Sequence, residues 1–136
     1  MTQFQPIGNP FKINVNTIEA DGSSNPNPDI AIASNGDFVT VWKRPYNGNL
    51  SDDDIYFRRF NADGTPKDAG DRVVTSKFTD EEKPSVSMAA DGSFVVTWIE
   101  PIGTDEDRLY VQRFDSEGNK LGGPQQIQVT NFANQF

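Results

Sequence analysis

The sequence predicts an all-β chain in which one four-stranded antiparallel unit occurs twice. Residues 28–44 return as residues 84–100, with Trp42 on Trp98, at an offset of 56 residues (84 − 28). Short apolar runs alternate with Asn-Gly, Asp-Gly and similar turn dipeptides, which is typical of strands joined by tight turns. No long stretch shows the 3.6-residue apolar period of a helix. We therefore expect almost no helix.

The repetition continues past this block and sets the expected domain boundaries. Residues 54–66 match residues 107–120, with Phe60 on Phe114, at an offset of 54 residues (114 − 60). The second unit has therefore lost two residues after its Trp. We expect an N-terminal strand and linker forming the tail of a preceding repeat, then two blade repeats, over residues 1–27, 28–83 and 84–136.

Each unit is expected to hold four strands. The expected strands are Ile30–Ala33, Phe38–Trp42, Ile55–Phe60 and Arg72–Ser76, then Val86–Ala89, Phe94–Ile99, Leu109–Phe114 and Gln126–Thr130. Asn35-Gly36 favours a tight hairpin between the first two. The second strand is apolar at nearly every position, so we expect both of its faces to be buried. A further strand is expected over Phe11–Asn16.

The fall in apolar content along each unit favours a blade of a β-propeller. Apolar content falls from the second strand to the fourth, as in blades whose neighbours cover both faces. A β-sandwich of about eight or nine strands is the alternative, although it does not require its halves to be copies. Two blades and one strand are too few to close a ring. We therefore expect a homo-oligomer, as a trimeric or tetrameric ring, or else a filament.

Two motifs carry a family resemblance. Residues 84–98 have the pattern Pro-x-Val-x-x-x-x-Asp-Gly-x-Phe-Val-Val-x-Trp, and residues 110–118 have Tyr-x-Gln-Arg-Phe-Asp-x-x-Gly. Together they resemble tandem repeats of large secreted bacterial proteins that carry hemolysin-type calcium-binding modules. The resemblance covers about residues 28–136. It implies propeller-like blades and an extracellular or cell-surface location.

Composition excludes several classes of function. The 136 residues carry a net charge of −8, which disfavours nucleic acid and anionic membrane surfaces as partners. The chain has no cysteine and no histidine, so disulfides, zinc sites with thiolate or imidazole ligands, and Ser-His or Cys-His nucleophiles are excluded. No apolar run approaches about 18 residues, so no membrane insertion is expected. The N-terminus lacks a cleavable signal, which leaves a cytoplasmic location, signal-independent export or a trimmed start as alternatives.

Acidic runs stand in equivalent places, in the long loops expected over Pro45–Asp54 and Pro101–Asp107. Carboxylate oxygens held together are the ligands that calcium prefers. The candidate calcium ligands are Asp52, Asp53, Asp54, Asp105, Glu106 and Asp107. The alternative is that these acids keep the loops solvated and protect strand edges from pairing. A glycoside hydrolase that uses two carboxyl groups is a distant third hypothesis, which the change of Asp54 and Asp107 to Asn would test on glycan substrates.

Aromatic residues divide into one candidate ligand site and a structural core. Tyr46, Asn47 and Asn49 place an aromatic ring beside amides, which favours a sugar site, whereas ordinary turn chemistry is the alternative. The expected core residues are Trp42, Trp98, Phe38, Phe94, Phe60 and Phe114. Arg59 and Arg113 are expected to pair with neighbouring acids.

These observations predict a non-catalytic binding or assembly module. Its blades would associate with copies of themselves or belong to a larger surface protein. The alternative is a lectin-like or adhesive module that binds glycans, with calcium in the acidic loops. No enzyme activity is expected, because no distinctive catalytic motif is present.

Overall fold

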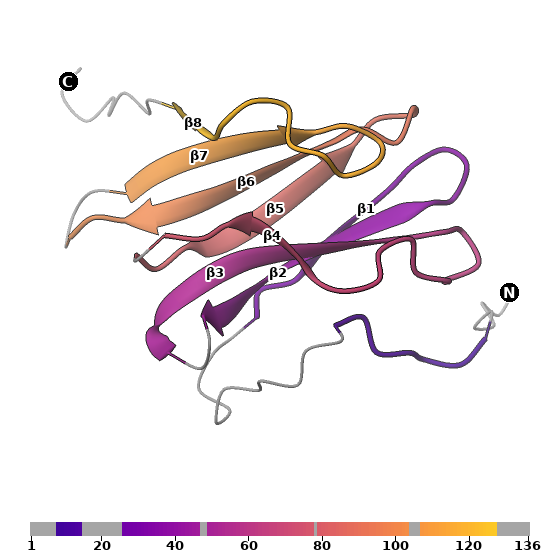
Figure 1. The fold of residues 1–136 in the computed structure, drawn as a ribbon, viewed down its shortest axis with the longest axis horizontal. Coiled ribbons are helices and arrows are strands. Elements are labelled where there is room, and N and C mark those ends of the chain that lie inside the picture. Colours follow the sequence, from indigo (N-terminus) through magenta and orange to yellow (C-terminus); the bar gives the residue numbers. More distant parts are fainter. Residues whose placement is uncertain (1–7, 15–25, 47–48, 78, 104–106, 128–136) are drawn as a thin grey trace, which may run out of the picture.

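The computed structural model describes residues 8–14, 26–46, 49–77, 79–103 and 107–127. These residues form an all-β structure without helices, in two four-stranded antiparallel sheets that stack face to face (Figure 1). This confirms the predicted fold class, with two blade-like units. Since the described residues form no helix, they contain none that could cross a membrane.

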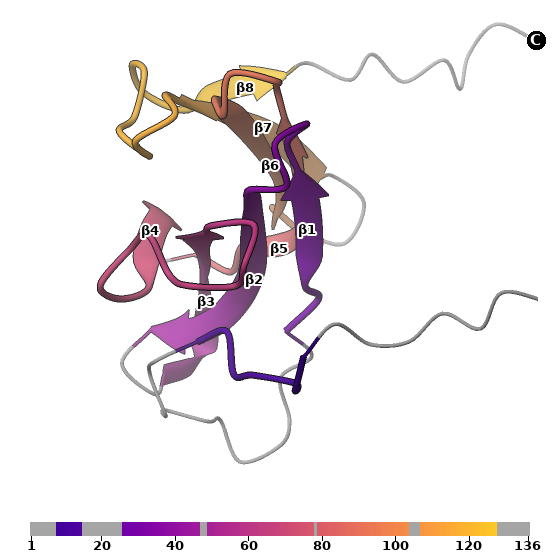
Figure 2. The same cartoon turned by 90° about the vertical axis from the view of Figure 1, so that its right-hand side faces the viewer.

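Each sheet takes its strands in chain order. Sheet 1 consists of β1 (Asp29–Ile32), β2 (Phe38–Tyr46), β3 (Asn49–Phe60) and β4 (Arg72–Thr75). Sheet 2 consists of β5 (Glu82–Met88), β6 (Phe94–Pro101), β7 (Asp107–Phe114) and β8 (Gln125–Ile127). Figure 2 shows the two sheets from the side; the chain passes from sheet 1 to sheet 2 between β4 and β5.

The central strands are longer than the sequence predicts. Most of the segment expected as the loop Pro45–Asp54 belongs to β2 and β3, which pair through Arg44↔Asp54 and Pro45↔Asp53 before a bulge. The ion pair between Lys43 Nζ and Asp53 Oδ2, 2.8 Å apart, joins the two strands in this region. Opposite charges on neighbouring strands offset the poor strand propensity of Asp, so the hairpin extends into the acidic run.

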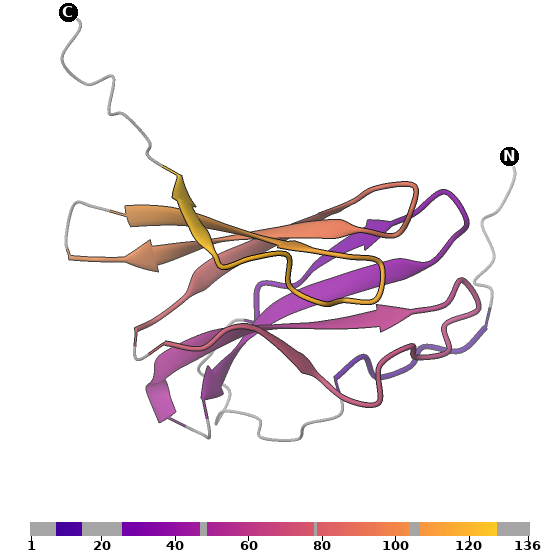
Figure 3. The same cartoon turned by 45° about the horizontal axis from the view of Figure 1, so that its top comes forward.

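The N-terminal strand expected over Phe11–Asn16 is the main departure. Residues 11–14 pair with no strand, and residues 15 and 16 lie outside the described part. Instead, the segment of residues 8–14 runs along the side of sheet 1 that faces away from sheet 2 (Figures 1 and 3). Its Phe11 ring lies 5.7 Å from the Phe60 ring, so side-chain contact replaces strand pairing.

Equivalent residues pair in equal register in the two sheets. Phe38 pairs with Phe60 across β2 and β3, as Phe94 pairs with Phe114 across β6 and β7. Both pairs stack, with ring centroids 4.9 and 4.7 Å apart. The sequence repeat is therefore also a repeat of cross-strand contacts.

Successive residues of a strand point to opposite faces, so each sheet has two faces. We call one the Trp face; it carries Phe38, Thr40 and Trp42 in sheet 1, and Phe94, Val96 and Trp98 in sheet 2. We call the other the Val face; it carries Val39, Val41, Ile55 and Phe57 in sheet 1, and Val95, Thr97, Leu109 and Val111 in sheet 2.

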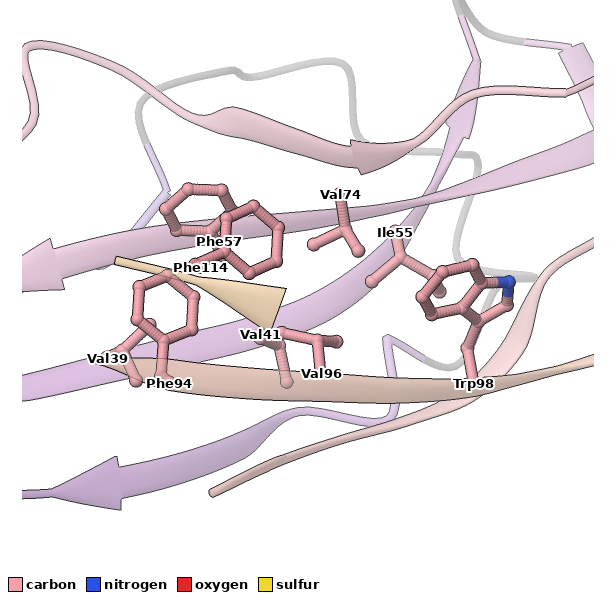
Figure 4. Close-up of a cluster of buried hydrophobic side chains, with 9 residues drawn as sticks. All are labelled: Val39, Val41, Ile55, Phe57, Val74, Phe94, Val96, Trp98 and Phe114. Atoms are coloured by element: carbon pink, nitrogen blue, oxygen red, sulfur yellow. The ribbon is translucent and has the colours of Figure 1, made fainter. Parts of the chain in front are cut away.

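The core lies where the Val face of sheet 1 meets the Trp face of sheet 2. Phe57 of sheet 1 contacts both Phe94 and Phe114 of sheet 2, at ring distances of 5.2 and 5.0 Å. The buried cluster consists of Val39, Val41, Ile55, Phe57, Val74, Phe94, Val96, Trp98 and Phe114 (Figure 4). The stack is therefore a head-to-tail contact between unlike faces of two similar sheets.

Candidate functional site

The contact between the sheets is fixed at one end by two guanidinium groups. Arg59 Nη1 donates to the carbonyl oxygen of Ser116 at 2.7 Å. Arg72 donates to the carbonyl oxygens of Glu117 and Gly118 at 2.8 and 2.6 Å. Two side chains of sheet 1 thus hydrogen-bond to the backbone of the turn that follows β7 of sheet 2.

Asp68 pairs with both of these cations. Its carboxylate lies 2.6 Å from Arg59 Nη2 and 3.3 Å from Arg72 Nη1. Burial raises the pKa of Asp68, but the hydrogen bonds and charge of Arg59 outweigh burial and hold that pKa below its ordinary value. Asp68 therefore stays ionised beside the core, between the two guanidinium groups that hold the turn after β7.

A second polar contact joins the first strands of the two sheets. Asp29 Oδ2 accepts hydrogen bonds from Ser85 Oγ at 2.8 Å and from the Val86 backbone N–H at 2.9 Å. Asp29 and Ser85 occupy equivalent positions in β1 and β5. This contact joins the start of β1 to the middle of β5.

The Trp face of sheet 1 has no sheet packed on it. Ile30 and Ile32 are 52% and 63% exposed there, whereas their equivalents Val86 and Met88 are half-buried against the core. A groove of about 450 Å³ opens on this face. It is mostly apolar and is lined by Ile13, Asn14, Pro26, Pro28, Asp29, Ile30, Thr40 and Trp42.

The segment of residues 8–14 covers only part of that face. Besides the contact of Phe11 with Phe60, Arg58 Nη1 donates to the Ile13 carbonyl oxygen at 2.8 Å. Phe11 itself remains 53% exposed. Phe60 and Trp42 on this face are buried, whereas Ile30 and Ile32 of β1 stay exposed beside the groove, so the uncovered part of the face is at β1.

The Val face of sheet 2 is the other open face. Its members Val95, Thr97, Leu109 and Val111 are half-buried, whereas their equivalents in sheet 1 are fully buried. Ile127 of β8 is 41% exposed. At position 99 this face carries an isoleucine where sheet 1 has Lys43, so its apolar stripe is longer. The molecule thus ends in a Trp face on one side and a Val face on the other.

The acids predicted as calcium ligands are placed differently from the prediction. Asp52, Asp53 and Asp54 lie within β3 and are buried rather than in a solvated loop. Asp107 is exposed at the start of β7, and residues 105 and 106 lie outside the described residues. In the described part of the chain, no group of three or more carboxylates is arranged to hold a metal ion.

A buried carboxyl pair was missed by sequence reasoning. Asp54 and Glu81 are both fully buried, and each has one side-chain oxygen without a hydrogen-bond partner. Burial, then the charge of Asp54, raises the pKa of Glu81 to about 8. Burial, then the charge of Asp52, also raises the pKa of Asp54. Nothing in the sequence marks Glu81, because its partner is 27 residues away.

Part of the predicted sugar site borders a cavity. Tyr46, which is 40% exposed, lines a cavity of about 320 Å³ together with Asp52, Ser76 and Lys77. Residue 47 lies outside the described part of the chain, and Asn49 is described only as the first residue of β3. The structure therefore brings a residue from each of the two ligand hypotheses, the sugar and the cation, to one cavity.

The predicted aromatic core residues lie in the expected strands. Phe94, Trp98 and Phe114 belong to the buried cluster, whereas Phe38, Trp42 and Phe60 lie on the open Trp face of sheet 1. Arg59 pairs with Asp68 as expected, whereas Arg113 makes no ion pair within the described residues. Gly122 stands in sheet 2 where sheet 1 has Asp68, which accounts for the difference.

Comparison with known proteins finds no matching family model, no matching curated protein and no matching solved structure.

Proposed function

We propose that this chain is a non-catalytic assembly module whose two open sheet faces bind further sheets of the same kind. Those sheets belong to copies of the chain or to neighbouring repeats of a larger surface protein. The observation that carries the proposal is that the two open faces are equivalents of the two faces already packed together inside the chain.

The packed contact shows which chemistry the open faces share. A Val face supplies aliphatic side chains and Phe57, and a Trp face supplies a tryptophan with a stacked Phe pair. Burying such faces is favourable by roughly 25 cal/mol per Å² of apolar area. Contiguous exposed apolar faces are uncommon in monomers and mark interaction surfaces. Because the contact joins unlike faces, its repetition gives a trimeric or tetrameric ring if the rotation closes, and a filament otherwise.

Sedimentation velocity over a concentration series tests the proposal. We expect the mass to rise from one chain to a trimer, a tetramer or longer species. Val111→Lys places a charge on the Val face and should weaken association by more than about tenfold. Ala90→Lys, in the exposed turn between β5 and β6, is the control with the same change in charge. A wild-type chain that stays monomeric at every concentration would contradict self-association.

Glycan binding is a second candidate function, favoured by the cavity beside Tyr46. An aromatic ring together with the carboxylate of Asp52, the hydroxyl of Ser76 and the ammonium of Lys77 suits a ligand with many hydroxyl groups. Screening on a glycan array, with and without calcium, tests this function. Binding that is lost in Tyr46→Ala would support it, and an array without any signal would remove it.

A further inference from the structure

We propose that residues 8–14 are an intramolecular cap on the Trp face of sheet 1, and that a second copy of the chain displaces this cap when its Val face docks there. The proposal rests on the proposed assembly function and adds to it the partner, the orientation of docking and its regulation. It is carried by two equivalent glycines whose surroundings differ.

The first of these glycines shows what a docked sheet looks like. Gly118 of sheet 2 lies against the Arg72 guanidinium of sheet 1, and a Cβ atom at this position would overlap that group. The neighbouring Phe114 ring packs on Phe57 of sheet 1. Contacts with Arg72 and Phe57 therefore mark a Trp face that is occupied by a Val face.

The second glycine shows the same place occupied by the cap. Gly64 is the equivalent of Gly118, and a Cβ atom there would lie 3.1 Å from Cε1 of Phe11. Phe60, the equivalent of Phe114, packs on the same Phe11 ring. One side chain of the cap thus takes the positions that Arg72 and Phe57 take in the packed contact. The cap and an incoming sheet cannot both be present.

The open Val face also carries charge that suits this site. Arg113 is the equivalent of Arg59, which donates to the Ser116 carbonyl oxygen in the packed contact. The equivalent of Ser116 is Ala62, and the exposed Asp63 follows it in the same turn. In the docked pair, Arg113 of one copy therefore meets the turn of residues 61–64 of the next copy.

The cap is poorly packed, which makes its displacement feasible. Phe11 is half exposed, Ile30 is 52% exposed, and the groove of about 450 Å³ lies beside the segment. The equivalents of Ile30 and Ile32 in sheet 2, Val86 and Met88, are half-buried against the core, so a docked copy would cover residues that the cap leaves exposed. Since only the uncapped fraction of chains can bind, the cap lowers the apparent affinity between copies.

Crosslinking tests the orientation, because the natural chain has no cysteine. Ala62→Cys and Arg113→Cys variants are mixed and treated with a short bismaleimide. We expect the mixed dimer in clear excess over either homodimer. Homodimers in excess would overturn the head-to-tail contact, although association itself would stand.

The Phe11→Ser variant tests the cap separately. Losing one aromatic contact from the cap should raise the association constant roughly two- to tenfold in sedimentation. A chain that associates head to tail with an affinity unchanged by Phe11→Ser would overturn the cap and leave the proposed function intact. A monomeric chain in every variant would overturn both.

Hydrogen exchange on the wild-type chain gives a readout that needs no variant. As concentration rises, amides of residues 11–14 should lose protection while those of Leu109 and Val111 gain it. Gain at both segments together would contradict displacement of the cap. This measurement stays decisive if Phe11→Ser fails to fold.

Discussion

Trp42 and Trp98 occupy the same position in two copies of one sheet, yet different structures cover them. Trp98 is fully buried beneath sheet 1, within the cluster that joins the two sheets. Trp42 is 7% exposed and lines a groove beside Ile13, Pro26 and Pro28, with no second sheet packed on it. Within the described residues, one face of each sheet packs on the other sheet and the opposite face has no sheet packed on it.

The largest expected effect separates these two tryptophans. Trp98→Ala should lower the free energy of unfolding by about 3–5 kcal/mol, since it empties a site enclosed by both sheets. Trp42→Ala should cost less, because Trp42 is buried beside a groove and not between two sheets. Urea unfolding followed by circular dichroism measures both values. Equal losses would mean that the Trp face of sheet 1 is as well packed as the contact between the sheets.

A pH titration tests the connection that holds the sheets together. Glu81 precedes β5, and its N–H donates to the Asp53 carbonyl oxygen at 2.9 Å. Burial raises the pKa of Glu81 from 4.5 to about 8, so the folded state holds a proton that the unfolded state releases. Stability should therefore be greatest below about pH 4.5 for this group and fall as pH rises to about 8, by up to about 1.4 kcal/mol per pH unit.

The matched variants for this titration are Glu81→Gln and Glu117→Gln. Glu81→Gln keeps the shape of the side chain without a proton to lose, so most of the fall in stability between pH 5 and pH 8 should disappear. Glu117 is exposed in the turn after β7, and its variant should follow the wild type. A Glu81→Gln profile that matches the wild-type profile would show that the pair is not protonated in the folded chain.

The fold was predictable because its signals are local. Each of the eight strands in the structure overlaps a strand predicted from apolar runs, and turns such as Asn35-Gly36 lie between them. Once the strands are known, the face of the sheet on which each side chain lies follows, because successive side chains alternate between the two faces. The equal registers of the two sheets follow from the repeat.

The candidate site was less predictable because it depends on contacts distant in sequence. Asp54 appeared to be a loop acid, but its strand extends and Glu81 of the next connection covers it. Phe11 was expected in a strand, but it packs on Phe60 instead. The sequence of a single strand does not show which of the two similar Trp faces, or of the two similar Val faces, packs against the other sheet.

Two equivalent arginines offer a smaller, matched test. Arg59→Met breaks a buried ion pair with Asp68 and a hydrogen bond to the other sheet, so we expect a loss of about 2–3 kcal/mol. Arg113→Met changes the exposed equivalent and should cost less than about 0.5 kcal/mol in dilute solution. Chemical denaturation of both variants measures the difference. An equal loss of unfolding free energy in the two variants would mean that the contact of Arg59 with the other sheet does not stabilise the fold.

The smallest effect concerns the first strand of each sheet. Val86→Ala removes atoms that pack against the core and should cost about 1 kcal/mol. Ile30→Ala removes one more carbon, but its side chain is 52% exposed, so we expect a loss of only about 0.5 kcal/mol. In sedimentation the order should reverse, because Ile30 lies on the face proposed to receive a second copy and Val86 does not. If Ile30→Ala changes neither unfolding nor association, that part of the Trp face lies outside the contact between copies.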